Sequence, residues 1–291
     1  MLPPATSNRR KYAVLLGALL CQMGLGYGYV LGALAGDILG ELEWTRTAYS
    51  GARAPQLFVI ALASPLIGAA TIRFGSRQVL ASAAVVLGIT FLLLGDLDSL
   101  WQLYGLVILM GFAVAGLGDI VVSQVISQWF TRNRGLALGV VFTGSNIGGF
   151  LLTRFSSSVA ESESWRLAFV TMGLGSFLVL VPAAWFLVRD ARPSRGDDKN
   201  ALEASPDDAG ALDGRAALRT RSFWILAFAL FTFFFYFMAL LEHLVLFLTD
   251  HGLPSSEARE WFSNAIGLGF VSKIVLGWVA DRLAPRATIL I

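Results

Sequence analysis

One lysine stands inside an apolar run near the C-terminal end of the sequence, where residues 270–282 read FVSKIVLGWVADR. If this run is a membrane-spanning helix, Lys273 lies 12 residues from Trp261 and 8 from Asp281, or roughly 18 Å and 12 Å along the helix axis. An ammonium at that depth needs a water-filled cavity or a counter-ion. Lys273 could therefore bind a carboxylate anion, or form a structural ion pair with Asp119 or with an acid on a helix outside this sequence.

Polar residues in other apolar runs could share a cavity with Lys273. Asp119 could carry a proton, or it could only keep Lys273 charged. Tyr27 and Tyr29 could present phenol donors to a bound anion, with aromatic packing as the alternative. Asn146 could contact the anion or hydrogen-bond to another helix. The sequence therefore predicts Lys273, Tyr27, Tyr29 and Asn146 as anion-binding candidates and Asp119 as the proton-coupling candidate.

Other kinds of chemistry find no support in the sequence. Cys21 is the single cysteine and there are two histidines, so neither an intrachain disulfide nor a zinc-ligand spacing occurs. No G-x-x-x-x-G-K-[ST] run is present, and nothing else indicates a nucleotide-binding loop. No nucleophile–base pair is apparent. We expect no enzyme activity, no cofactor, no metal, and neither a nucleotide nor a nucleic-acid partner.

The elements that must position these residues are membrane helices. Hydrophobic residues make up 56% of the 291 positions, charged residues 14%, and the mean hydropathy is +0.67. A soluble domain has about 25% charged residues, and about 20 apolar residues in a helix cross the hydrocarbon core of a bilayer. The sequence predicts an all-α polytopic membrane protein with eight such runs, at about 12–36, 53–72, 79–95, 104–128, 135–158, 166–188, 222–248 and 261–280.

The placement of Lys and Arg predicts the orientation, because cytoplasmic loops carry an excess of these residues. With a cytoplasmic N-terminus, most of the 22 Lys and Arg fall in cytoplasmic segments, and only Arg46, Arg53, Arg166 and Arg259 fall in outer ones. The first apolar run is longer than the core of a signal peptide, so we expect it to remain as the first helix. We predict a multi-pass protein of the cell (inner) membrane, embedded in the lipid bilayer, with its N-terminus in the cytoplasm.

One polar stretch divides the chain. Residues 189–221 are rich in charge, Ala, Gly and Pro and nearly free of large apolar side chains, so they cannot bury enough surface to fold alone. We interpret them as a cytoplasmic linker. The predicted organisation is an N-terminal six-helix bundle at 1–188, the linker at 189–221, and a partial C-terminal bundle of two helices at 222–291.

An internal repeat connects the two bundles. The run GAATIRFGSR at 68–77 closes the second apolar run, and GWVADRLAPR at 277–286 closes the eighth, with Gly first, Arg sixth and Arg tenth in both. Each resembles the G-x-x-x-D-R-x-G-x-R loop of the major facilitator superfamily, with Ile72 in place of the usual Asp and Ala284 in place of the second Gly. The predicted motif residues are Gly68, Arg73, Gly75 and Arg77 in the first copy, and Gly277, Asp281 and Arg282 in the second.

A second stretch narrows the resemblance. The run WFTRNRGLALGVVFTGSNIGG at 129–149, which includes Arg134, resembles the fifth-helix signature of monocarboxylate transporters and their bacterial relatives, including the oxalate:formate antiporters. In that family an arginine of helix 8 binds the substrate carboxylate, four residues before the motif glycine. Counting back from Gly277 gives Lys273, so the resemblance implies that this cation binds the substrate.

These observations predict a major facilitator fold with a complete N-terminal bundle and the first two helices of the C-terminal one. The resemblance implies a secondary active transporter of small organic anions, monocarboxylate or dicarboxylate, that works by alternating access with proton symport or anion exchange. The alternative is a membrane receptor or assembly factor of the same fold. Because that fold needs six helices in each half, we expect the sequence to be a truncated form of a roughly 400-residue transporter, incompetent for transport alone.

Overall fold

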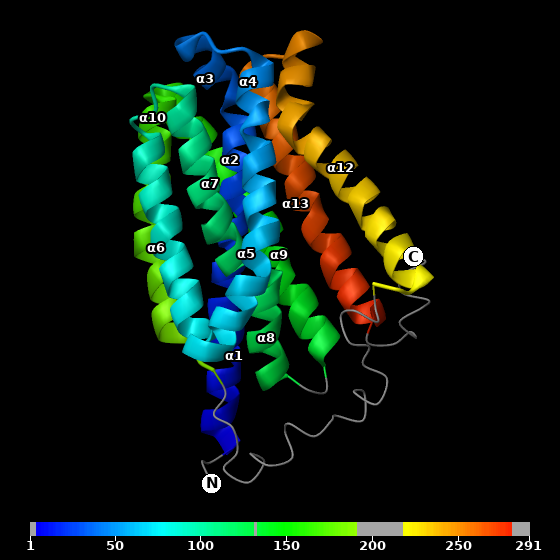
Figure 1. Cartoon of the computed structure of the whole chain (residues 1–291). Helices are drawn as coiled ribbons and strands as arrows, with labels where there is room; N and C mark the ends of the chain where they lie inside the picture. The colour runs from blue at the N-terminus through cyan, green and yellow to red at the C-terminus, as the bar shows by residue number, and fades with distance from the viewer. Residues whose placement is uncertain (1–3, 131–132, 191–217, 281–291) are drawn as a thin grey trace. The chain divides into compact units, whose positions relative to one another are not determined.

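The computed structural model describes residues 4–130, 133–190 and 218–280, and these residues form helices joined by short turns, without a strand (Figure 1). Seven helical stretches in this part of the chain are long and apolar enough to cross a membrane. Each matches one of the predicted apolar runs, which confirms the all-α polytopic class. The seven are Asn8–Ala33, Arg46–Phe74, Ser76–Leu94, Leu100–Trp129, Arg134–Ser162, Trp165–Leu187 and Arg221–Leu241.

Several of these stretches consist of more than one helical segment. The first contains α1 (Pro4–Met23), the short 3-10 segment η1 (Gly24–Gly26) and α2 (Tyr27–Ala33), and is followed by α3 (Ala35–Leu42). The second joins α4 (Arg46–Gly51) to α5 (Arg53–Phe74), and the third is α6 (Ser76–Leu94). The fourth joins α7 (Leu100–Leu117) to α8 (Asp119–Trp129), and the fifth is α9 (Arg134–Ser162). The sixth continues from α10 (Trp165–Gly175) into two short π-helical segments, η2 (Ser176–Leu180) and η3 (Ala183–Leu187).

Two further helices complete the described residues, α12 (Arg221–Asp250) and α13 (Ser255–Ala280). The eighth predicted run, 261–280, is helical within α13 but is not among the seven candidate spans. The count of eight spans therefore stays a prediction.

The chain forms two compact units, one of residues 1–190 with 245–291 and the other of residues 191–244. In the second unit the described residues are mainly the first part of α12. Its aromatic rings stack at helical spacing, with Phe231 and Phe235 centroids 6.2 Å apart and those of Phe233 and Phe237 5.8 Å apart. The predicted division at 189–221 also stays a prediction, because residues 191–217 lie outside the described residues.

The first and fourth spans are interrupted within their length. The first narrows to a 3-10 turn at Gly24–Gly26, and the fourth breaks at Gly118, whose backbone is extended (φ −72°, ψ −179°). The predicted apolar run at 104–128 therefore forms one candidate span, Leu100–Trp129, made of two helices. A helix end leaves backbone N–H groups without helical acceptors, and the break makes Asp119 the first residue of α8.

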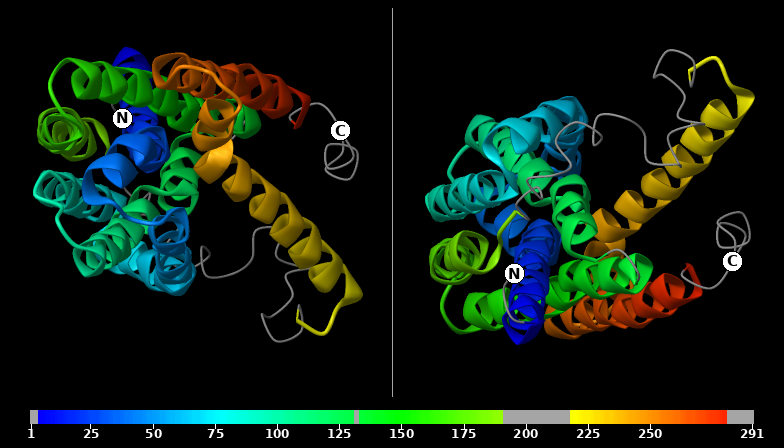
Figure 2. Two further views of the ribbon diagram at one scale, coloured as in Figure 1. Left: turned by 90° about the horizontal axis from the view of Figure 1, so that it is seen from above. Right: turned by 90° about the horizontal axis from the view of Figure 1, so that it is seen from below.

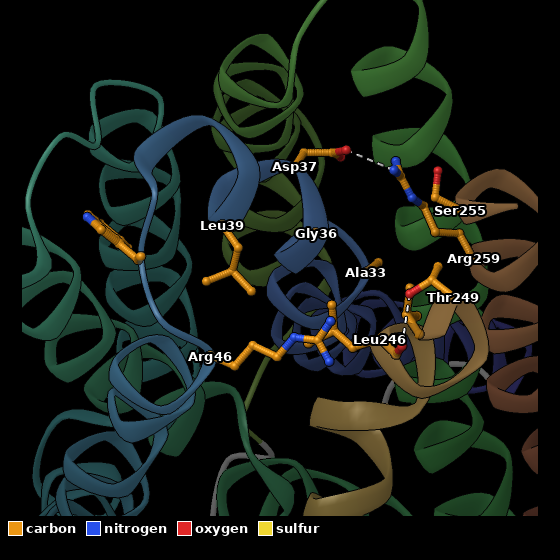
Figure 3. Close-up of a pocket in the computed structure, with 11 residues that line it drawn as sticks. Ala33, Gly36, Asp37, Leu39, Arg46, Leu246, Thr249, Ser255 and Arg259 are labelled. Atoms are coloured by element: carbon orange, nitrogen blue, oxygen red, sulfur yellow. Dashed lines mark hydrogen bonds and ion pairs between the residues drawn. The ribbon is translucent and has the colours of Figure 1, made fainter. Parts of the chain in front are cut away.

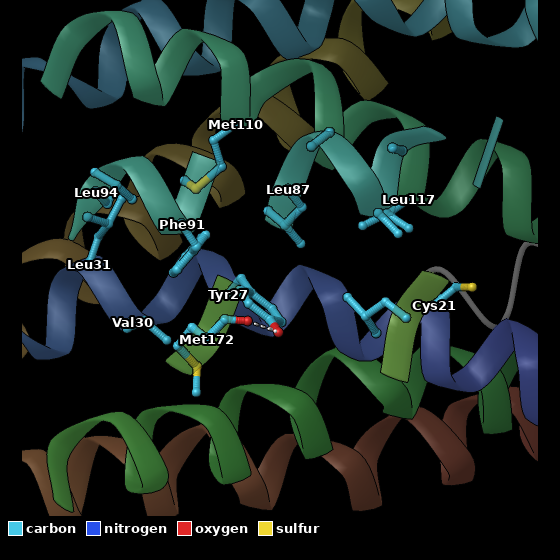
Figure 4. Close-up of a cluster of buried hydrophobic side chains, with 14 of the residues drawn as sticks. Cys21, Tyr27, Val30, Leu31, Leu87, Phe91, Leu94, Met110, Leu117 and Met172 are labelled. Atoms are coloured by element: carbon cyan, nitrogen blue, oxygen red, sulfur yellow. Dashed lines mark hydrogen bonds between the residues drawn. The ribbon is translucent and has the colours of Figure 1, made fainter. Parts of the chain in front are cut away.

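The core of the first unit lies between the two interrupted spans and their neighbours (Figure 4). Tyr27 is almost completely buried there, and its ring meets the Phe91 ring edge to face with centroids 4.8 Å apart. Its hydroxyl donates to the backbone oxygen of Met172 at 2.8 Å, which satisfies the one polar group that this tyrosine brings into the core. Tyr27 therefore fixes the packing of α2 against α6 and α10.

Glycines let α1 and η1 touch α9 backbone to backbone. A Cβ on Gly148 would overlap the backbone oxygen of Met23 and lie 2.7 Å from its Cα. A Cβ on Gly144 would overlap the backbone oxygen of Leu19, and one on Gly26 would overlap the backbone of Gly148 and Gly149. Small residues on a membrane helix allow this close approach.

The turn between α5 and α6 is built on the first copy of the repeat. Gly75 ends α5 with φ +87°, a conformation that side chains rarely adopt. Asp190 at the end of the sixth span accepts a hydrogen bond from the backbone N of Ser76 at 3.1 Å, so a carboxylate caps the N-terminus of α6. A nearby acid from elsewhere in the chain thus engages this turn, in which Ile72 replaces the acid of the family pattern.

Helices α9 and α13 lie side by side over much of their length, as the two views along the bundle show (Figure 2). The contacts pair Phe142 with Lys273 at one end and Arg154 with Glu260 at the other. Because α9 residue numbers rise while α13 numbers fall, the two helices are antiparallel. This pair positions the lysine that the sequence analysis singled out.

Substitution Gly148→Ala should destabilise the protein, because the added Cβ has no space against Met23. Overpacking of this kind costs about 1–3 kcal/mol, so we expect a lower melting temperature in detergent, measured by size-exclusion chromatography after heating. Gly105→Ala is the matched control, since nothing lies within 4 Å of its Cβ position. An unchanged melting temperature for Gly148→Ala would contradict the close packing of α1 on α9.

Candidate anion-binding site

Lys273 extends from α13 across to α9. Its Nζ donates to the backbone oxygen of Phe142 at 3.0 Å and to Ser145 Oγ at 2.6 Å, and the side chain is half-buried. Both acceptors are neutral, and no carboxylate of the described residues lies within 4.0 Å of the ammonium. An ammonium has three N–H donors, so two hold it in place and the third remains to meet an anion.

The predicted ion pair between Lys273 and Asp119 is not formed in this structure. Asp119 instead accepts a hydrogen bond from Gln22 Nε2 at 2.9 Å. Asp119 is the first residue of α8 and is exposed.

Asp119 and Lys273 are connected through one turn of α9. Gln22, the partner of Asp119, packs against Gly144, where an added Cβ would lie 2.9 Å from Gln22 Cβ. The next residue, Ser145, is the hydroxyl acceptor of Lys273. Gln22 contacts Asp119 and Ser145 contacts Lys273, so two consecutive residues of α9, Gly144 and Ser145, connect the proton-coupling candidate to the cation.

A series of polar contacts runs along the α9–α13 pair on the side of Ser145 away from Phe142. Asn146 Nδ2 donates to the backbone oxygen of Ile266 at 2.8 Å, and its Oδ1 is buried without a partner among the described residues. Seven residues further along α9, Thr153 Oγ1 and Ser263 Oγ are 2.8 Å apart. We call these contacts, with the Lys273 contacts, the α9–α13 seam. They support the helix-to-helix alternative for Asn146.

The two predicted tyrosines lie in different surroundings. Tyr29 is half-buried and packs beside Gly149, where an added Cβ would lie 2.6 Å from Tyr29 Cδ2 and equally close to Ile266 Cγ2. Its ring therefore borders the seam. Tyr27 is buried in the core and its hydroxyl is used by Met172. These contacts favour the packing alternative for Tyr27, and its role in anion binding stays a prediction.

The described motif residues of the repeat lie in α5, the α5–α6 turn, α6 and α13. Arg77 lies over the Trp185 ring at 4.1 Å, and Arg73 near the Phe74 ring at 5.2 Å. Gly68 faces open space, and Arg134 is exposed in the first turn of α9. Gly277 belongs to α13, whereas Asp281 and Arg282 lie outside the described residues.

Two residues of the site were missed by the sequence analysis. Ser145 reads as one small residue among several in a glycine-rich run, and only the neighbouring helix makes it an ammonium acceptor. Gln22 carried a signal, because a carboxamide inside the apolar first run is unusual and must find a partner. Its partner Asp119 lies 97 residues away in the sequence, which no local pattern predicts.

A bundle of membrane-crossing helices with a polar seam and a half-buried cation is the architecture of a polytopic membrane transport protein. Residues 14–291 match the family model described as Major Facilitator Superfamily, so the chain belongs to this superfamily. The resemblance stated from the sequence is confirmed. Members of the superfamily are transporters and not enzymes, so the chain is not an enzyme.

Among curated proteins, the oxalate:formate antiporter of Oxalobacter formigenes is 31% identical over 232 residues, which cover 77% of this chain and 52% of the antiporter. Human monocarboxylate transporter 11 is 29% identical over 280 residues, which cover 92% of this chain and 56% of that protein. The chain thus spans a little over half the length of these relatives.

Among solved structures, the crystal structure of a bacterial homologue of the human lysosomal transporter Spinster matches with a TM-score of 0.72 at 18% identity. The match covers 98% of this chain and 64% of that one. At this level of identity the likeness establishes the fold.

Substitution Thr153→Val should weaken the seam, because it removes the hydroxyl that meets Ser263. Hydrogen bonds between membrane helices contribute about 0.6–2 kcal/mol, so the melting temperature should fall. Thr171→Val is the matched control, since the Thr171 hydroxyl bonds only within its own helix, to Ala168. Equal melting temperatures for the two variants would mean that the contact does not stabilise the helix pair.

Proposed function

We propose that the protein is a secondary active transporter of small organic anions and that Lys273 binds the carboxylate. The observation that carries the proposal is the half-buried ammonium held by two neutral acceptors, with no carboxylate of the described residues within 4.0 Å. A charge in that position is costly without an anion. The names of the oxalate:formate antiporter and monocarboxylate transporter 11 support this substrate class.

Binding at Lys273 would take place where α9 and α13 meet. The ammonium is anchored to α9 by Phe142 O and Ser145 Oγ while its main chain belongs to α13. A carboxylate on the third donor would therefore act on both helices, which belong to the two predicted bundles. This is the arrangement that alternating access requires, since the two bundles rock about a site between them.

Asp119 is proposed as the group that exchanges a proton in symport. When ionised it accepts from Gln22 Nε2. When protonated its hydroxyl would need an acceptor, and Gln22 Oε1 is buried without a partner among the described residues. Reorientation of the Gln22 amide would supply that acceptor. Because Gln22 packs on the turn of α9 that holds Lys273, protonation would change the packing beside the anion site.

The orientation and the organisation are part of the same proposal. The distribution of Lys and Arg supports a cytoplasmic N-terminus, and we propose the cell (inner) membrane as the location. A non-transporting receptor or assembly factor is the alternative, and it shares every feature of the fold. Flux separates the two. In proteoliposomes with purified protein, saturable uptake of labelled lactate, pyruvate, oxalate or formate supports transport, and saturable binding without flux supports the receptor.

Replacing Lys273 by Gln should abolish anion uptake and remove binding at the α9–α13 site while leaving membrane insertion intact. Loss of one charge-assisted hydrogen bond costs about 1.5–3 kcal/mol, or at least about tenfold in affinity. Lys273→Arg should keep part of the activity because the positive charge remains. Affinity and uptake of labelled anion are measured together with insertion.

Ser272→Ala is the control for Lys273, since the neighbouring hydroxyl bonds only to Gly269 of the same helix. Wild-type binding and uptake by Lys273→Gln would remove Lys273 from the site.

Replacing Asp119 by Asn should abolish uptake driven by a pH gradient but preserve exchange of labelled for unlabelled anion. The amide can still meet Gln22 but cannot release a proton. Glu161→Gln, an exposed acid in the last turns of α9, is the control. If Asp119→Asn keeps gradient-driven uptake, Asp119 does not carry the proton.

A further inference from the structure

A second polar cavity lies at the opposite end of α13 from the seam residues around Lys273. It has a volume of about 390 Å³ and is lined by residues of α2, α3, α4, the last turns of α12 and the start of α13 (Figure 3). Arg259 on its wall is 14 residues from Lys273 on the same helix, or about 21 Å at 1.5 Å per residue. The cavity is therefore separate from the proposed transport site.

The cavity wall carries two guanidinium groups and the N-terminus of a helix. Arg46 and Arg259 line it together with a single acid, Asp37. Ser255, the first residue of α13, also lines it. The first helical hydrogen bond of α13 runs from Ala258 N to the backbone oxygen of Pro254 at 2.9 Å. The N–H groups that precede it are left outside the helical series and carry the positive end of a 26-residue helix.

Arg259 is the group that indicates a ligand. Its side chain is only 6% exposed, and its Nη2 donates to Asp37 Oδ1 at 2.9 Å. Its Nε and Nη1 are buried without a partner among the described residues, and so is Asp37 Oδ2. Buried polar groups without partners cost free energy. One internal ion pair therefore leaves this guanidinium incompletely satisfied at the cavity wall.

Arg46 faces the cavity from the opposite side and is held in place by an acid outside the lining. Its guanidinium forms two hydrogen bonds to the Asp250 carboxylate, at 2.5 and 2.8 Å. The same contact holds the pKa of Asp250 below its ordinary value, so that carboxylate stays ionised at neutral pH. The Arg46 side chain is still 53% exposed. Unlike Arg259, Arg46 can meet an incoming anion without any change in the protein core.

The remaining wall sets the size and character of the ligand. Ala33, Leu39, Val245 and Leu246 also line the cavity and are apolar. The volume is near the lower end of the roughly 300–1,000 Å³ found for small-molecule sites. A small anion with one carboxylate and a short apolar body meets both conditions.

We propose that this cavity is a second binding site, for a small organic monocarboxylate, with Arg46 and the N-terminus of α13 as the first contacts. The carboxylate then shares the Arg259 guanidinium with Asp37 after a rotation of that side chain. This inference rests on the proposed function in one respect, because the ligand belongs to the class of anion proposed to bind Lys273. It captures that anion about 21 Å along α13 from the transport site.

Binding of labelled lactate to purified protein tests the proposal in a Lys273→Gln background, which removes the transport site. Lys273→Gln should retain one saturable lactate site for each protein. Adding Arg46→Gln should weaken that site at least about tenfold, the loss expected for a charge-assisted hydrogen bond. Arg46 is exposed, so its substitution leaves the core intact. Arg259→Gln should weaken lactate binding to a similar extent. Because this variant leaves Asp37 without its partner, its lactate affinity is compared only after the protein is shown to remain folded.

Arg154→Gln in the same background is the matched control. Arg154 is also a half-exposed arginine paired with an acid, Glu260 at 2.7 Å, but it does not line the cavity. The proposal is overturned if Lys273→Gln binds no lactate, or if Arg46→Gln and Arg154→Gln leave its affinity equal. Failure of the proposed function looks different, because wild-type protein and Lys273→Gln would then show the same stoichiometry and the same flux.

Discussion

The structure depends on one constraint, that an ammonium placed inside a membrane helix must find acceptors on a neighbouring helix. Lys273 reaches Phe142 O and Ser145 Oγ only because α13 approaches α9 closely. Small residues permit that approach, and Gly269 is so near α9 that a Cβ would collide with Asn146. On its other face α9 is backed by α1 through Gly144 and Gly148. The close packing of three helices is thus the condition for one buried charge.

The same packing brings two kinds of chemistry to one turn of α9. Gln22 packs against Gly144 and donates a hydrogen bond to Asp119. Ser145, which follows Gly144, accepts a hydrogen bond from Lys273. The breaks in the first and fourth spans make this possible, because a continuous α7–α8 helix would not place Asp119 at a helix N-terminus. In a medium of low dielectric constant such charges influence one another without direct contact. Coupling between a proton and an anion needs no ion pair between Asp119 and Lys273.

The two proposed anion sites differ in how strongly solvent and salt screen their charged groups. Arg46 is half exposed and its interactions are screened by salt over about 8 Å. Lys273 is half-buried between two helices, where screening is weaker. The first arrangement suits rapid, weak capture of an anion from solution, and the second suits selective binding during transport.

The sequence by itself determined the class of the protein and the positions of its membrane helices, and it singled out Lys273. Apolar runs and the repeat at 68–77 and 277–286 are local patterns, and a lysine among apolar residues is conspicuous in any linear reading. Only the tertiary structure decided which groups Lys273 meets, that Tyr27 packs in the core, that Gln22 holds Asp119, and that Arg259 faces a cavity beside Asp37. These contacts join residues from 97 to 222 positions apart, and their partners depend on how closely glycine-bearing helices approach one another. The hydrophobic pattern of a single helix carries no information about that distance.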